Sequence, residues 1–109
     1  MLYLGNAFSV GMLDQEFALL YVRRINEEAA KKLLRSQEWV SCVGHADTAL
    51  LFSNLLNTEV QMNRCSTSLQ FGDVILVGQY NGPRLPEGAT SLPEGAKIRW
   101  MMIEVDRQM

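Results

Sequence analysis

The segment from Tyr80 to Gly95 constrains the fold of this chain most, because neither a helix nor a central strand can run through it. It contains all three prolines of the chain and three of its eight glycines. Proline lacks a backbone donor and glycine favours turns, so the segment predicts a long flexible loop. A loop of this length inside a small domain is usually functional or disordered. An imperfect duplication, LPEGATS then LPEGAK, is too short to predict a repeat protein.

Apolar patterning on either side of this loop predicts strands and helices in mixed order. Strand-like runs are Leu2–Gly5, Phe17–Ile25, Glu38–Val43, Asp73–Gln79 and Ile98–Val105, with weaker ones at Glu59–Met62 and Ser66–Phe71. Asn6–Ser9 is turn-like and can cap a brief helical turn. The strict alternation of a doubly wound fold is missing. We therefore expect an α+β fold, with one mixed β-sheet flanked by helices in a single domain over residues 1–109.

Two helices are expected from their starts and their apolar spacing. Asn26, followed by two glutamates, predicts the start of a helix that ends near Ser36 with cations in its last turns. The run TALLFSNLLN predicts a second helix, with Asp47 or Thr48 as its N-cap. Its start lies directly after His45, the single histidine of the chain.

Charge and composition exclude several classes of protein. Ten Lys and Arg residues stand against twelve Asp and Glu residues, so the net charge of −2 offers no general field for long nucleic acid. A small anionic ligand remains possible, since a few cations in one pocket can hold it. No leader or apolar span is evident, so we expect a cytoplasmic protein with no membrane segment. Cys42 and Cys65 are expected to be reduced.

The chemistry-bearing residues allow more than one interpretation. A histidine before a helix start lies where backbone N–H groups favour phosphate, but it can equally just complete a turn. A Cys42–His45 dyad is conceivable, and a closed zinc site lacks enough ligands. Arg64 follows a strand-like stretch, and Arg84 lies in the proline-glycine loop. An arginine in a mobile loop can clamp phosphate or simply be solvated. The other cations are most simply surface charges: Arg23, Arg24, Lys31, Lys32, Arg35, Lys97, Arg99 and Arg107.

Four segments, in order and spacing, resemble one family. LGNAFSVGML, VGHADTALLFSNLLN, QMNR and GQYNGPRLPEG are similar to the small viral and bacterial ring nucleases that act as anti-CRISPR proteins. The resemblance covers nearly the whole chain. It implies a homodimeric α+β protein that binds cyclic tetra-adenylate, the second messenger of type III CRISPR immunity, and cleaves it without a metal or cofactor to linear di-adenylates.

The same resemblance assigns roles to individual residues. It makes His45 the catalytic histidine, with Arg84 and Glu87 as further catalytic residues. Ligand contacts fall on Asn6, Ser9, Thr48, Arg64 and Gln79. Because the Leu-Pro-Glu-Gly sequence occurs twice, Glu94 is an alternative to Glu87, and the intact Arg-Leu-x-Glu-Gly run favours Glu87.

Three functions therefore remain to be compared. The first is a metal-independent phosphodiesterase that antagonises type III CRISPR signalling, in the host cytoplasm if the protein is viral. The second is a non-catalytic module that sequesters a cyclic nucleotide. The third is a structural or regulatory dimer whose histidine has no chemical role.

Overall fold

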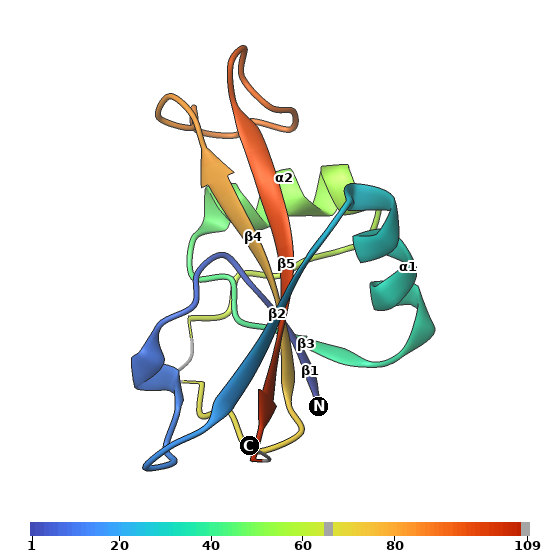
Figure 1. The fold of residues 1–109 in the computed structure, drawn as a ribbon. Helices are drawn as coiled ribbons and strands as arrows, with labels where there is room; N and C mark the ends of the chain where they lie inside the picture. The colour runs from blue at the N-terminus through green and yellow to red at the C-terminus, as the bar shows by residue number, and fades with distance from the viewer. Residues whose placement is uncertain (65–66, 108–109) are drawn as a thin grey trace.

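One five-stranded mixed sheet forms the centre of the protein (Figure 1). The computed structural model describes residues 1–64 and 67–107. The elements are β1 (Leu2–Gly5), a 3₁₀ turn η1 (Val10–Met12), β2 (Leu19–Ile25), α1 (Glu27–Ser36), β3 (Trp39–Ser41), α2 (Ala46–Leu56), β4 (Val74–Asn81) and β5 (Lys97–Asp106). The strand order is β2-β5-β4-β1-β3, and β1 is parallel to both β3 and β4. The expected α+β fold, with a mixed sheet and two helices, is confirmed.

Strand β4 is buried on both of its faces, which explains its uninterrupted apolar run. Leu76 faces the helices, whereas Ile75 and Val77 belong to a second apolar cluster on the other face. Strand β5 pairs antiparallel with β4. Its cations alternate with Ile98 and Trp100 in the first half of the strand, and its carboxylates alternate with Ile103 and Val105 in the second half. Its alternating sequence therefore reflects two unequal sides of the sheet.

Both helices cover the same face of the sheet (Figure 1). Helix α1 contributes Ala30 and Leu34 to this core, and α2 contributes Ala49, Phe52 and Leu56. These side chains pack against β-strand residues that include Leu2, Leu4, Leu76 and Trp100. The main apolar core thus lies between one sheet face and two helices.

The second face of the sheet is only partly covered. Phe8, Met12 and Leu13, from the chain after β1, pack there with Leu69 against the β4 and β5 side chains. Farther along the same face, Val22 is 55% exposed, and Gln79 and Arg99 are exposed. We call this uncovered part the open surface, and its residues are Val22, Arg24, Gln79, Lys97, Arg99 and Met101.

The first predicted helix is confirmed together with its cap. Asn26 Oδ1 accepts a hydrogen bond of 2.8 Å from the Ala29 N–H, and Glu27 and Glu28 occupy the first turn. A side-chain acceptor and two negative charges both stabilise the positive end of a helix. The local sequence therefore determines where α1 begins.

The predicted cap of the second helix is wrong. Helix α2 begins at Ala46 and His45 is its N-cap, so Asp47 and Thr48 lie inside the first turn. The His45 backbone is extended, and its carbonyl oxygen accepts the Ala49 N–H at 3.0 Å. Asp47 is equally favourable inside the first turn, because its charge opposes the positive helix end.

Several predicted strand boundaries also need correction. Strand β2 begins at Leu19, β3 covers only Trp39–Ser41, and β4 continues to Asn81, so the long loop spans residues 82–96. Residues 59–62 form no strand. Their backbone bonds to a side chain instead of to a neighbouring strand: the Ser41 hydroxyl donates to the Gln61 carbonyl at 2.6 Å.

The last weak strand prediction is also wrong in the part that can be described. Ser66 lies outside the described residues, and Leu69 forms a single parallel bridge with Leu13. The thiol of Cys42 lies 2.9 Å from the Thr67 hydroxyl. The prediction for Cys65 falls outside the described residues.

Candidate functional site

The residue before His45 is held by a side chain from the other end of the sequence. Asn6 follows β1, and its Oδ1 accepts a hydrogen bond of 3.2 Å from the Gly44 N–H, 38 residues away. The Cys42 N–H donates to the Leu4 carbonyl at 2.7 Å just upstream. The end of β1 therefore fixes the backbone that leads into α2.

Arg64 holds the other side of the same connection. Its Nε donates to the Gly44 carbonyl oxygen at 3.4 Å, and the neighbouring Asn63 N–H donates to the Val43 carbonyl at 2.8 Å. Asn6 and Arg64 thus bind the N–H and the carbonyl of one glycine. This arrangement brings two of the predicted ligand residues to the peptide that precedes the predicted catalytic histidine.

His45 itself is exposed at the start of α2. Its carbonyl oxygen is used by the helix, whereas its side chain makes no capping hydrogen bond. Backbone N–H groups of the first turn and the helix dipole favour negative charge at this position. The imidazole is therefore exposed to solvent at the start of α2, next to a main chain that Asn6 and Arg64 hold at Gly44.

The loop between β4 and β5 reaches the same helix start. The Gly88 N–H donates a hydrogen bond of 3.3 Å to Asp47 Oδ1, in the first turn of α2. Figure 1 shows this loop extending beyond the end of the sheet. The predicted loop residue Glu87 precedes Gly88, so its backbone is tied to the helix that begins after His45.

The two copies of the duplicated sequence form the same turn. The Ala89 N–H donates to the Pro86 carbonyl at 3.2 Å, and the Ala96 N–H donates to the Pro93 carbonyl at 3.0 Å. The third residue is glycine in both, with φ of 76° at Gly88 and 83° at Gly95. This positive φ is what a type II turn requires.

Among the described residues, the first of these turns donates a hydrogen bond to α2. The choice of Glu87 over Glu94 as the carboxylate of the site stays a prediction.

A small hollow joins two other predicted residues on the open surface. It encloses about 290 Å³ and is lined by Asn6, Ala7, Phe8, Val22, Val77, Gln79, Met101 and Ile103. Asn6 and Gln79 supply amide groups, whereas most of the lining is apolar. Pockets of this composition suit a flat ligand with polar edges, such as a nucleobase.

The remaining predicted residues form no hydrogen bond or ion pair with the His45 side chain within the described part of the chain. Ser9 is the exposed N-cap of η1, and Thr48 lies one residue after Asp47 in α2. Arg84 and Glu87 are exposed in the loop, and neither forms a salt bridge within the described part of the chain. Their catalytic and ligand roles stay predictions.

Sequence reasoning missed two features of this region. The first is the Gly44 main chain, whose two partners come from distant segments. The second is a set of three cations, Arg24, Lys97 and Arg99, which were interpreted as separate surface charges but lie on the open surface together. Strand alternation places each cation on a face, and the strand order then brings them together.

Within residues 1–64 and 67–107, no group of three or more His, Cys, Asp or Glu side chains is arranged to hold a metal ion. In the same part of the chain, neither helix is long and apolar enough to cross a membrane.

The fold and the site define a small α+β protein with a polar cluster where β1, α2 and the β4–β5 loop meet. The chain belongs to the STIV B116-like family, whose model matches residues 2–100. The structure of B116 of Sulfolobus turreted icosahedral virus superposes with a TM-score of 0.80 at 28% identity, covering 94% of this chain and 97% of that one.

Two viral relatives support the expectation of a viral protein. Uncharacterized protein 26 of Sulfolobus islandicus filamentous virus is 32% identical over 76 residues, which are 70% of this chain and 64% of that protein. Uncharacterized protein ORF116 of Acidianus filamentous virus 1 is 32% identical over 89 residues, which are 79% of this chain and 73% of that protein. The match with the first relative thus spans just under two thirds of its length.

Proposed function

We propose that this protein is a metal-independent ring nuclease that cleaves cyclic tetra-adenylate to linear di-adenylates and so antagonises type III CRISPR signalling. The observation that carries the proposal is the double anchoring of Gly44 by Asn6 and Arg64. These two contacts hold the main chain before an exposed His45 at a helix N-terminus. An imidazole placed beside a helix end that favours phosphate is suited to phosphodiester cleavage.

The substrate supplies its own nucleophile. A ribose 2′-hydroxyl loses its proton to a solvent water and its oxygen attacks the adjacent phosphorus. The bond from phosphorus to the 5′-oxygen breaks, and a 2′,3′-cyclic phosphate results. The protein then has to hold the three reacting atoms in line. Asn6, Ser9, Thr48, Arg64 and Gln79 are the proposed ligand-holding residues.

His45 acts as the general acid and gives its proton to the leaving 5′-oxygen. An imidazole suits this role near neutral pH, and general acid catalysis typically contributes about 10²–10⁴ in rate. Arg84 stabilises the charge on the phosphoryl oxygens, and Glu87 orients Arg84 or His45. The contact between Gly88 and Asp47 supports this assignment, because it ties the loop to the start of α2.

A homodimer is part of the proposal. One chain carries one histidine, whereas two cuts are needed to open the ring into two halves. A two-fold axis through the ligand presents His45 twice and doubles the arginines around its four phosphates. Light scattering tests this expectation, and a monomer with full activity would contradict it.

The decisive experiment incubates the protein with cyclic tetra-adenylate in EDTA and separates the products by chromatography. We expect linear di-adenylates with a 2′,3′-cyclic phosphate end. Binding without turnover identifies the sequestering module instead. Absence of both leaves the structural or regulatory dimer, and a requirement for an added divalent ion refutes the metal-independent mechanism.

Substitution of the histidine separates catalysis from binding. His45→Ala should retain affinity for the ring and lose about two to four orders of magnitude in rate. Arg35→Ala, an exposed change at the end of α1, is the control and should retain full turnover. An unchanged rate in His45→Ala would refute the assignment of the general acid.

A further inference from the structure

The open surface is positively charged although the protein as a whole is acidic. Strand residues of the second sheet face include Arg24 on β2 and Lys97 and Arg99 on β5. The remaining β2, β4 and β5 positions on this face are uncharged: Leu20, Val22, Ile75, Val77, Gln79, Asn81, Met101, Ile103 and Val105. The acidic residues of β5, Glu104 and Asp106, occupy the opposite face. Three cations therefore share one surface that carries no strand carboxylate.

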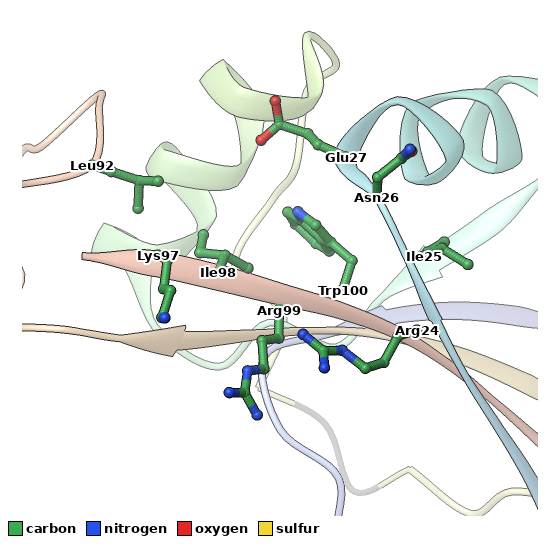
Figure 2. A pocket seen from close by; sticks show the side chains of 9 residues that line it. All are labelled: Arg24, Ile25, Asn26, Glu27, Leu92, Lys97, Ile98, Arg99 and Trp100. Atoms are coloured by element: carbon green, nitrogen blue, oxygen red, sulfur yellow. The ribbon is translucent and has the colours of Figure 1, made fainter. Parts of the chain in front are cut away.

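The pairing register places these cations close to one another. Arg24 is the direct partner of Met101, so Arg99 is its diagonal neighbour, at a distance of roughly 7–8 Å between Cα atoms. Lys97 follows two residues before Arg99 on the same side of β5. Figure 2 shows all three side chains directed to the same side of the strands, away from Trp100.

A hollow of about 330 Å³ opens where β2 leaves the sheet edge to enter α1, and these cations line it. Its other lining residues are Ile25, Asn26, Glu27, Leu92, Ile98 and Trp100. Glu27 is the carboxylate of this group, and Figure 2 shows it on the far side of Trp100 from Arg24 and Arg99. None of the three cations forms a salt bridge with any other described residue.

The cations also adjoin the candidate site. Arg99 is the direct cross-strand partner of Gln79, which lines the neighbouring 290 Å³ hollow together with Asn6. Val22 and Met101 line that same hollow and lie next to Arg24 and Arg99 on their strands. A continuous surface therefore runs from the amide groups of Asn6 and Gln79 to the three cations.

We propose that Arg24, Lys97 and Arg99 bind a phosphate of the nucleotide ligand other than the one cleaved at His45. This inference rests on the proposed function and specifies its substrate class: an oligonucleotide with more than one phosphodiester. A guanidinium group binds two phosphate oxygens through paired N–H donors. The adjoining apolar hollow receives a base, while the cations neutralise the phosphate attached to it.

The arrangement makes affinity depend on the number of phosphates. A mononucleotide occupies either the cleaved-phosphate position or the cationic surface, whereas an oligonucleotide ring occupies both. We therefore expect the protein to bind cyclic tetra-adenylate far more tightly than adenosine 5′-monophosphate. The cations also explain how an acidic protein can hold a small polyanion.

Arg23 provides a matched control for this proposal. It precedes Arg24 on β2 and has the same charge, but its partner is Met102 and it lies on the other side of the sheet. Arg24→Ala and Arg99→Ala should each weaken binding of cyclic tetra-adenylate by about tenfold. Arg23→Ala should change it by less than about twofold.

Salt dependence separates phosphate contact from a structural effect. A plot of log affinity against log salt concentration has a negative slope. Each lost phosphate contact should make that slope less steep by about 0.7 for a single-stranded ligand. Arg24→Ala should show this change, and Arg24→Lys should restore the slope because it retains the charge. An unchanged slope with weaker binding would overturn the phosphate role.

The outcomes distinguish this inference from the proposed function. If the ring is cleaved normally by Arg24→Ala and Arg99→Ala, with affinities within twofold of the unmodified protein, the cationic surface is not a phosphate site and the ring nuclease stands. If the unmodified protein neither binds nor cleaves the ring, the proposed function fails.

Titration with tripolyphosphate then decides the inference separately, by NMR. Side-chain Nε–H signals of Arg24 and Arg99 should shift, whereas that of Arg35 should not. Equal behaviour of all three signals would overturn the inference.

Discussion

Substitution of Gly78 by alanine tests how closely α2 packs on the sheet. Gly78 lies on β4 beneath two aromatic rings. A Cβ atom built there would lie 2.5 Å from Cζ3 of Trp100 and 2.7 Å from Cζ of Phe52. The two ring centroids are 5.0 Å apart, and both side chains are almost fully buried. Neither ring can move aside without disturbing the core.

The expected cost follows from two opposing terms. Overpacking of a well-packed core costs typically about 1–3 kcal/mol. Replacing glycine by alanine lowers the entropy of the unfolded chain and returns about 0.4–1 kcal/mol. Gly78→Ala should therefore lower the free energy of unfolding by about 1.3 kcal/mol, the difference between the midpoints of these two ranges.

Urea denaturation at fixed protein concentration measures this change. The midpoint should fall while the m-value stays the same. Gly11→Ala is the control, because its Cβ would meet only Ser9 Oγ, at an ordinary 3.5 Å. In a Phe52→Leu background, which removes the ring atom at 2.7 Å, Gly78→Ala should cost clearly less. Equal costs in the two backgrounds, or an unchanged midpoint in Gly78→Ala, would refute the packing argument.

Three further predictions concern hydrogen bonds seen in the structure. Asn26→Ala removes the cap of α1 and should lower the free energy of unfolding by about 1 kcal/mol, measured as a lower urea midpoint; an unchanged midpoint would show that the cap is dispensable. Asp47→Ala releases the Gly88 N–H, so hydrogen exchange at that amide should accelerate, and an equal rate would contradict the attachment of the loop to α2. Asn6→Ala removes the acceptor of the Gly44 N–H. The activation free energy of ring cleavage should rise by more than the free energy of unfolding falls, whereas equal changes in the two free energies would indicate a purely structural role.

The regular elements were largely predictable because their signals are local. The Asn26 cap and the two glutamates after it determine the start of α1. The apolar run of β4 reflects burial on both faces, and alternation in β5 reflects one face with cations and another with carboxylates. The start of α2 was misplaced because the four successive residues from His45 to Thr48 include several with acceptable cap or first-turn chemistry.

The assembly of the site was not predictable from local pattern. Asn6 meets Gly44 across 38 residues, Arg64 meets it across 20, and Gly88 meets Asp47 across 41. Such contacts depend on strand order and on the path of loops. The family resemblance predicted Asn6 and Arg64 as ligand-binding residues, and that role stays a prediction; the structure shows that both contact Gly44.

The cationic surface was missed for a related reason. Alternation places Arg24 on one side of β2 and Arg99 on one side of β5, and the antiparallel pairing makes those sides the same. Nothing local in the sequence says that the second strand pairs with the last. A sheet order is therefore the minimum information needed to group these charges.

Because its turn sequence is duplicated, the β4–β5 loop can change in length through loss or gain of one copy. Loss of one copy removes about half of residues 82–96 and still leaves a proline-glycine turn that leads into β5. Closure entropy varies only with the logarithm of loop length, so halving the loop changes stability by about 0.6 kcal/mol. A duplication or deletion by replication slippage can thus alter the reach of the loop over α2 in one mutational step, while the sheet below retains its stability and its register.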